Sequence, residues 1–155
     1  WVEAWRNRAI VRSQTGDMKG ALSDCDEAVK RAPDNMDALV TRGMFRANTG
    51  DNQGALADLD VVLAMDARNL IALIYRGNAK AGLSDIRGAL ADYEAACAVA
   101  PDSPEANADR GMALLALGER DEARKSLEKA LQVAPADWAF RAEIEKSLAE
   151  LRRAR

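Results

Sequence analysis

The stretch GDMKGALSDCDEAVKRAP, residues 16–33, decides the fold because the chain repeats it at a fixed distance. It returns 34 residues later as GDNQGALADLDVVLAMDA (50–67), then as SDIRGALADYEAACAVAP (84–101) and as GERDEARKSLEKALQVAP (118–135). No insertion or deletion interrupts this spacing. Self-similarity with a period of 34 residues is typical of a solenoid built from two-helix units. We therefore predict an all-α chain in which each unit packs against its neighbours.

The composition excludes several kinds of chemistry. The formal net charge of −3 argues against non-specific nucleic-acid binding, which needs a dense positive surface. The chain has no histidine, so the commonest general base and imidazole metal ligands are missing. Cys25 and Cys97 fall on or beside apolar helical positions, and we interpret them as small buried side chains, with a reactive thiol or a disulfide as the alternative. We predict no catalytic residue, no metal and no cofactor.

The sequence also bears on membrane insertion and on the cellular compartment. No apolar run approaches the ~20 residues of a membrane span, so we expect no membrane insertion. The chain begins at Trp1 inside a helical pattern, and we expect it to be a fragment of a longer protein. We expect a soluble chain, and its compartment stays open between the cytoplasm and the periplasm.

Two helical patterns fill each period. The first helices are expected near 2–15, 36–49, 70–83 and 104–117, and the second near 18–31, 52–65, 86–99 and 120–133. Glycine follows three of the first helices, at Gly16, Gly50 and Gly118, where a left-handed cap is favoured. An acidic residue then precedes each second helix and favours its amide-rich start (Asp17, Asp51, Asp85 and Glu119). The predicted repeat units are 2–35, 36–69, 70–103 and 104–137.

A small residue recurs inside the first helices, at Ala9, Gly43, Gly77 and Gly111. Glycine inside a helix costs about 1 kcal/mol relative to alanine, so we expect the second helix to approach closely there. Arginine precedes each of these positions (Arg8, Arg42, Arg76 and Arg110). Aspartate stands sixteen residues after the first three, and serine after the fourth (Asp24, Asp58, Asp92 and Ser126). Two interpretations stay open: ion pairs within each unit, or solvated arginines whose stems lie on apolar neighbours.

The last stretch, 138–155, departs from the repeat. Phe140, Ile144, Leu148 and Leu151 form an apolar stripe at helical spacing, and Asp137 is placed to cap its start. Glu145 stands where the small residue should come, so no further helix is expected to pack there. We predict a C-terminal capping helix with one face on the last unit.

These spacings resemble the tetratricopeptide repeat (TPR), whose pattern is W-x₂-L-G-x₂-Y…A-x₃-F…P. The matching positions are Trp5, Leu39 and Leu73 for the first place; Ala9, Gly43, Gly77 and Gly111 for the glycine; Ala21, Ala55, Ala89 and Ala123 for the alanine; Cys25, Leu59, Tyr93 and Leu127 for the aromatic; and Pro33, Pro101 and Pro135 for the proline. The family's leucine is arginine in every unit, its tyrosine is replaced by Arg12, Arg46, Lys80 and Leu114, and Asn107 opens the fourth unit. The sequences of the repeats resemble those of bacterial TPR proteins.

The resemblance implies a right-handed superhelix whose concave groove, lined by the first helices, binds a peptide or protein segment. The free face of these helices carries an apolar strip where a solvated face would be polar. The apolar members are Ile10, Val40, Met44, Ile71, Ile74, Tyr75, Met112 and Leu115, and the polar rim is Arg6, Asn7, Thr41, Asn78 and Asp109. Such a strip favours a protein-binding surface. The alternative is that curvature packs these residues against one another, with no ligand.

We therefore predict a non-enzymatic scaffold or adaptor module that binds a protein or peptide. The alternative is a self-associating (homodimeric) or regulatory TPR segment of a larger enzyme or of a secretion or envelope protein. The clamp with which co-chaperone TPR domains hold an acidic C-terminus is not expected, because Ile10, Thr41, Ile71 and Tyr75 replace its polar positions. The acidic residues Asp24, Asp26, Asp58 and Asp60 are interpreted as a solvated outer face rather than as catalytic pairs.

Overall fold

The computed structural model describes residues 1–153, which form nine helices and no strand. The first helices of the four units are α1 (Val2–Gln14), α3 (Met36–Thr49), α5 (Leu70–Gly82) and α7 (Pro104–Ala116). The second helices are α2 (Met18–Arg31), α4 (Asn52–Met65), α6 (Ile86–Val99) and α8 (Arg120–Val133), and α9 (Arg141–Arg153) follows them. The predicted all-α class and helix positions are confirmed.

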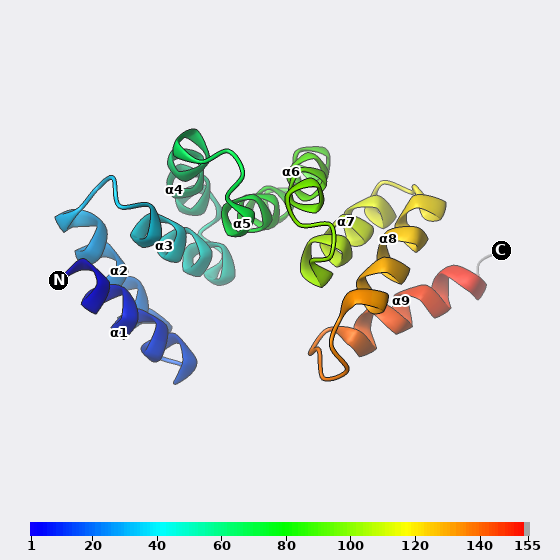
Figure 1. The fold of residues 1–155 in the computed structure, drawn as a ribbon, viewed down its shortest axis with the longest axis horizontal. Coiled ribbons are helices and arrows are strands. Elements are labelled where there is room, and N and C mark those ends of the chain that lie inside the picture. Colours follow the sequence, from blue (N-terminus) through cyan, green and yellow to red (C-terminus); the bar gives the residue numbers. More distant parts are fainter. Residues whose placement is uncertain (154–155) are drawn as a thin grey trace.

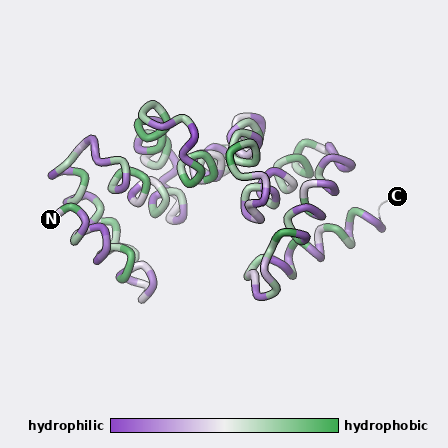
Figure 2. The backbone as a smooth tube through the Cα atoms, in the orientation of Figure 1, coloured by the Kyte–Doolittle hydropathy of each residue, from purple (hydrophilic) through white to green (hydrophobic). Residues whose placement is uncertain are grey.

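The helix pairs follow one another along an arch that is part of a superhelix. Figure 1 shows α4 and α6 on the outer side of this arch and α3, α5 and α7 on its inner side. Hydrophobic and hydrophilic residues alternate along each helix, so that each helix has a packed face and a solvated one (Figure 2). Between residues 1 and 153, no helix has the length and apolar character that crossing a membrane would require.

The turn inside each unit follows from its local sequence. Gly16, Gly50 and Gly118 adopt φ values of 85°, 84° and 82°, in the left-handed region that glycine enters without strain. Ser84 takes the same place in the third unit at a φ of 66°. The next residue caps the second helix: Asp17, for example, accepts a hydrogen bond from the backbone N–H of Gly20 at 2.9 Å. The predicted glycine caps are thus confirmed, while Glu119 makes no such side-chain bond.

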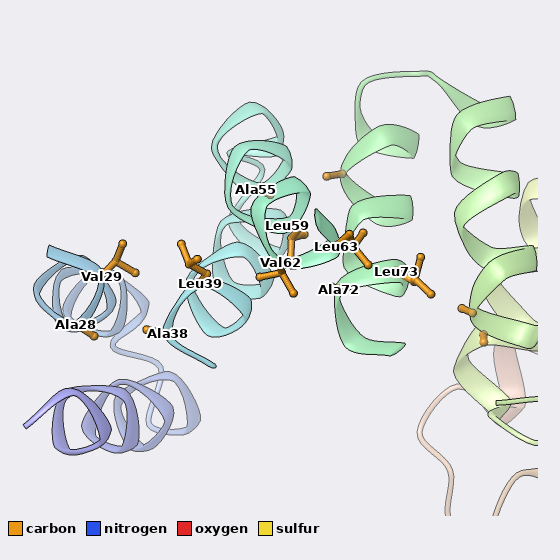
Figure 3. Packing of buried hydrophobic residues seen from close by; sticks show 13 residues of the cluster. Ala28, Val29, Ala38, Leu39, Ala55, Leu59, Val62, Leu63, Ala72 and Leu73 are labelled. Atoms are coloured by element: carbon orange, nitrogen blue, oxygen red, sulfur yellow. The ribbon is translucent and has the colours of Figure 1, made fainter. Parts of the chain in front are cut away.

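Close approach of the two helices in a unit explains the glycines inside the first helices. A Cβ added at Gly43 would lie 2.7 Å from Leu59 Cγ, and one added at Gly111 would lie 2.5 Å from Leu127 Cδ2. The second helix therefore packs a large side chain directly on the first helix's backbone. Figure 3 follows the largest buried cluster, which runs from α2 to α7 and includes Leu39, Leu59 and Leu73.

A network of ion pairs joins the two helices in each of the first three units. Asp24 accepts hydrogen bonds from Arg8 Nε and Nη2 and from Arg12 Nη1, each at 2.7 Å. The equivalent groups are Asp58 with Arg42 and Arg46, and Asp92 with Arg76 and Lys80. Asp24 is only 1% exposed. The ion-pair interpretation is therefore confirmed, and the solvated-face interpretation is wrong for Asp24 and Asp58.

The second cation of each network was not recognised from the sequence, although it stands one helical turn after the first. Arg12, Arg46 and Lys80 occupy the place of the family's tyrosine, and each reaches the buried aspartate of its own unit. Asp26 and Asp60 do lie on the exposed surface, where they form ion pairs with Arg42 and Arg76 of the following unit, at 3.0 and 2.9 Å. Charged side chains thus link consecutive units as well as paired helices.

The C-terminal helix differs from its prediction at the start. Helix α9 begins at Arg141, so Asp137 is not its cap and Phe140 precedes it. Phe140 stands at the register position of Ala38, Ala72 and Ala106, which are at most 1% exposed. A phenyl ring does not fit such a site, and Phe140 is 54% exposed. The rest of the stripe, Ile144, Leu148 and Leu151, is buried against Ala108, Leu127 and Ala130 of the fourth unit.

Candidate protein-binding surface

The residues expected in the groove fall into two groups, and those of the N-terminal half pack mostly within the solenoid. Ile10 and Met44 are half-buried against the Phe45 cluster, and Val40 packs against the largest cluster. Thr41 is 6% exposed, and its hydroxyl donates to the carbonyl oxygen of Asp37 at 2.7 Å. Arg6 forms an ion pair with Asp37 at 3.3 Å. Asn7 and Ile71 remain exposed on the same side.

The expected groove residues of the C-terminal half come together around one pocket. Ile74, Tyr75 and Asn78 of α5 face Asp109 and Met112 of α7 across a pocket of ≈ 320 Å³. The remaining lining residues are Asn48, Glu105, Ala108, Trp138, Phe140, Glu143 and Ile144. Helical periodicity explains the grouping, because residues three and four apart share one face of a helix. Asn48 belongs to α3, and the other lining residues come from α5, α7, α9 and the segment between α8 and α9. Figure 1 shows α3, α5 and α7 on the inner side of the arch.

An aromatic wall closes one side of this pocket. Trp138 and Phe140 pack edge to face with ring centroids 5.7 Å apart. The indole Nε1–H of Trp138 donates to Glu105 Oε1 at 3.1 Å, which ties the segment between α8 and α9 to α7. Sequence reasoning missed this wall. The available signal was Phe140 itself, a large residue at a register position where the preceding units have a buried alanine.

The pocket is acidic. Three carboxylates line it, from Glu105, Asp109 and Glu143, and none of its lining residues is a lysine or an arginine. Within residues 1–153, the Asp109 carboxylate has no ion-pair partner within 4.0 Å and no hydrogen bond. Burial raises the pKa of Asp109 to about 7, and the nearby charge of Glu105 adds to the effect. The pocket therefore holds a partly buried carboxylate that no cation of the described residues contacts.

The remaining candidates for chemistry are structural. Cys25 is 1% exposed, and burial raises the pKa of its thiol to about 12, so its interpretation as a small buried side chain is confirmed. Cys97 is half-buried and is likewise a free thiol, and burial raises its pKa too. In the described part of the chain, no three acidic or cysteine side chains are grouped so that they could hold a metal ion.

Comparison with known proteins agrees with this architecture. Two sequence profiles described as tetratricopeptide repeat match residues 6–70 and 104–137. The chain belongs to the tetratricopeptide repeat family. A search of curated proteins finds no match to this TPR chain.

Solved TPR structures share the fold at low sequence identity. A thermophilic TPR protein from Thermus thermophilus is 24% identical, with a TM-score of 0.84 over 99% of this chain and 82% of that one. MamA from Desulfovibrio magneticus RS-1 is 22% identical, with a TM-score of 0.75 over 99% of this chain and 96% of that one. The first TPR of Spaghetti (RPAP3), solved bound to the HSP90 peptide SRMEEVD, is 19% identical, with a TM-score of 0.71 over 76% and 93% of the two chains.

Proposed function

We propose that this TPR chain is a protein-interaction module that holds a segment of a partner protein on its inner face. The observation that carries the proposal is the pocket between α5, α7 and α9. Apolar and aromatic side chains line it together with a few convergent polar groups, which is the usual composition of a binding site. The predicted groove residues that remain exposed outside the pocket, Asn7 and Ile71, would guide the segment, and the pocket would anchor it.

The family supports this class of function. TPR domains are commonly protein-binding modules and are generally not enzymes, and the first TPR of RPAP3 is solved with a peptide bound. The side chains that line the pocket suit the binding of a partner segment. The binding energy would come from a small number of buried side chains near the pocket centre, as in other protein interfaces.

The test begins with peptides selected on the purified chain from a random dodecapeptide library displayed on phage. Their affinities are then measured by titration calorimetry for two matched variants. Met112→Ala removes a pocket side chain that is 38% exposed, and Met65→Ala removes the same type of side chain, 51% exposed, on the outer helix α4. We expect Met112→Ala to weaken binding about tenfold and Met65→Ala to leave it unchanged. Equal affinities for the two variants, or a library that yields no binding peptide, would refute the proposal.

The same two variants, Met112→Ala and Met65→Ala, also distinguish self-association of the chain from binding of a foreign segment. Light scattering across concentration measures whether the free chain is a monomer. A dimer that dissociates in Met112→Ala and persists in Met65→Ala would assign the surface to a second copy of the chain instead of a foreign segment.

A further inference from the structure

We propose that the pocket binds a basic side chain, arginine or lysine, of the partner segment, with the Asp109 carboxylate as its counter-ion and the Trp138 and Phe140 rings against its stem. This inference rests on the proposed function and specifies the partner's chemistry. The partner segment then carries one basic residue among the apolar residues that follow the rest of the groove.

The charges of the pocket are complementary to those of a basic side chain. The repeat units satisfy their buried carboxylates internally: Asp24, Asp58 and Asp92 each contact two cations of their own unit. Asp109 alone among these four has no cation within the described residues, although it is half-buried. A partly buried carboxylate without a cation is unfavourable, and a partner's cation would offset part of its cost. Glu105 and Glu143 add to the negative potential at the same place.

The rings of Trp138 and Phe140 also suit a basic side chain. A guanidinium or ammonium group over an aromatic ring is attracted by the ring's negative face, and its methylene stem gains apolar contact. The chain already uses this contact elsewhere, because Arg8 and Arg31 lie over the Trp5 ring at 4.4 and 5.7 Å from its centroid. In the pocket, the Glu105 hydrogen bond and the Phe140 ring hold Trp138 in place before any partner arrives.

The size and the charge of the pocket select the kind of segment that fits. A pocket of ≈ 320 Å³ accommodates one long side chain rather than a helix or a strand. An acidic peptide such as the SRMEEVD segment bound by the RPAP3 domain would bring like charges against Glu105, Asp109 and Glu143. Like charges placed together in a partly buried site repel, so the pocket discriminates against that class of partner.

The experiment uses the selected peptides at about pH 8, where the Asp109 carboxyl is mainly ionised. The first step compares each basic residue in a peptide with a neutral replacement, citrulline for arginine or norleucine for lysine. We expect the enriched peptides to share a basic residue whose replacement weakens binding about tenfold.

The second step completes a double-mutant cycle with Asp109→Asn. We expect this variant to bind the basic peptide about tenfold more weakly than the wild-type chain does, and to bind the neutral peptide equally well. Asp34→Asn, at an exposed carboxylate in the turn before α3, is the control and should change neither affinity. Circular dichroism checks that each variant keeps its helices.

The results of these experiments distinguish the binding of a basic side chain from the proposed binding of a partner segment. Peptides that lack a shared basic residue, or that bind wild type and Asp109→Asn alike, overturn the inference while Met112→Ala still weakens binding. Peptides that bind Met112→Ala and Met65→Ala equally well refute the proposed function itself, and a library that yields no binding peptide counts against both.

Discussion

The first three units and the fourth share one backbone arrangement but differ in the charges between their helices. In the first three, a buried aspartate is held by two cations; in the fourth, Ser126 replaces the aspartate and Leu114 replaces the second cation. The Nε of Arg110 and the Oγ of Ser126 are consequently buried with no hydrogen-bond partner among residues 1–153. Since α7 and α8 still pair, the ion network is not what makes the two helices of a unit pack together.

The shared feature is the glycine that receives a large side chain. Gly43, Gly77 and Gly111 lie against Leu59, Tyr93 and Leu127, whether or not the charges are present. The comparison of the units therefore assigns different roles to two interactions. The packing contact at the glycine pairs the two helices, whereas the ion network adds stability and orientation. Substitutions in both kinds of unit test this assignment.

The largest effect is expected from Asp58→Ala in the second unit. It leaves Arg42 and Arg46 without the carboxylate that each contacts, at 2.7 and 2.9 Å. Breaking a buried ion pair from one side costs about 3 kcal/mol of unfolding free energy. Urea unfolding followed by circular dichroism measures the loss.

The matched control for this change is Asp60→Ala on the same helix. The Asp60 side chain is 62% exposed in its ion pair with Arg76, so its loss should cost well under ~1 kcal/mol. An equally small effect of both changes would show that the buried network is dispensable.

Gly111→Ala tests the packing contact in the unit that lacks the network. The new Cβ would lie 2.5 Å from Leu127 Cδ2, and such overpacking costs about 1–3 kcal/mol, partly offset by alanine's higher helix propensity. Gly43→Ala should cost a similar amount in the second unit, because its Cβ would meet Leu59 Cγ at 2.7 Å. Thermal unfolding compares the two. A stabilised Gly111→Ala variant would mean that close approach does not set this pairing.

The two regions should also respond oppositely to pH. The hydrogen bond from Arg8 holds the pKa of Asp24 below its ordinary value, so its stabilisation is present above the unfolded pKa of 3.8 and is lost as pH falls further. Burial raises the pKa of Asp109 to about 7, so the folded state holds a proton that the unfolded state has released, and stability falls as pH rises from about 4 to about 7. The titratable groups around Asp109 include Glu105, Glu143, Tyr75, Tyr93 and Cys97, and Arg110 is its neighbour in the chain.

Amide hydrogen exchange measured by NMR can follow the pH dependence of stability separately in each helix. Between about pH 4 and pH 7, corrected protection factors in α7 should fall while those in α1 and α2 stay constant. In Asp109→Asn, the fall in α7 should disappear. A fall of equal size in that variant would assign the pH dependence to another group.

The smallest effect is expected from restoring the missing charge. Ser126→Asp places a carboxylate where the first three units have theirs, opposite Arg110, and should stabilise the chain by about 1 kcal/mol. Adding Leu114→Arg supplies the second cation and should increase the gain. Ser126→Asn is the uncharged control. Stabilisation by Asn equal to that by Asp would show that hydrogen bonding, rather than charge, satisfies Arg110.

Much of the architecture was predictable because it depends on interactions that repeat. The helix bounds follow from signals within a few residues, such as Gly50 before Asp51 at the turn into α4. The close approach at Gly43 follows from a helix-breaking residue that recurs in register. The ion pairs were half predictable: Arg42 and Asp58 were paired as one of two interpretations, but the part played by Arg46 was not recognised.

The candidate site was less predictable. Ile74, Tyr75, Asn78, Asp109 and Met112 were chosen for the free face of their helices, and they line the pocket. Met44 and Thr41 were chosen by the same rule but lie partly or wholly within the packing of the N-terminal units. The rule identifies a side of each helix, but how much of that side stays open depends on its neighbours.

The sequence by itself determined the repeat, the helices, their caps and the closest contacts within each unit, since these depend on neighbouring residues and on a period that survives in every copy. Only the tertiary structure decided that a pocket forms at one end of the groove. The pocket requires α5, α7 and the segment from Trp138 to Ile144 to meet in space, although they are far apart in the sequence and no signal within a few residues predicts their contact. It also requires Phe140 to be excluded from a buried alanine site, which leaves the Phe140 ring beside that of Trp138 in the lining of the pocket that contains Asp109.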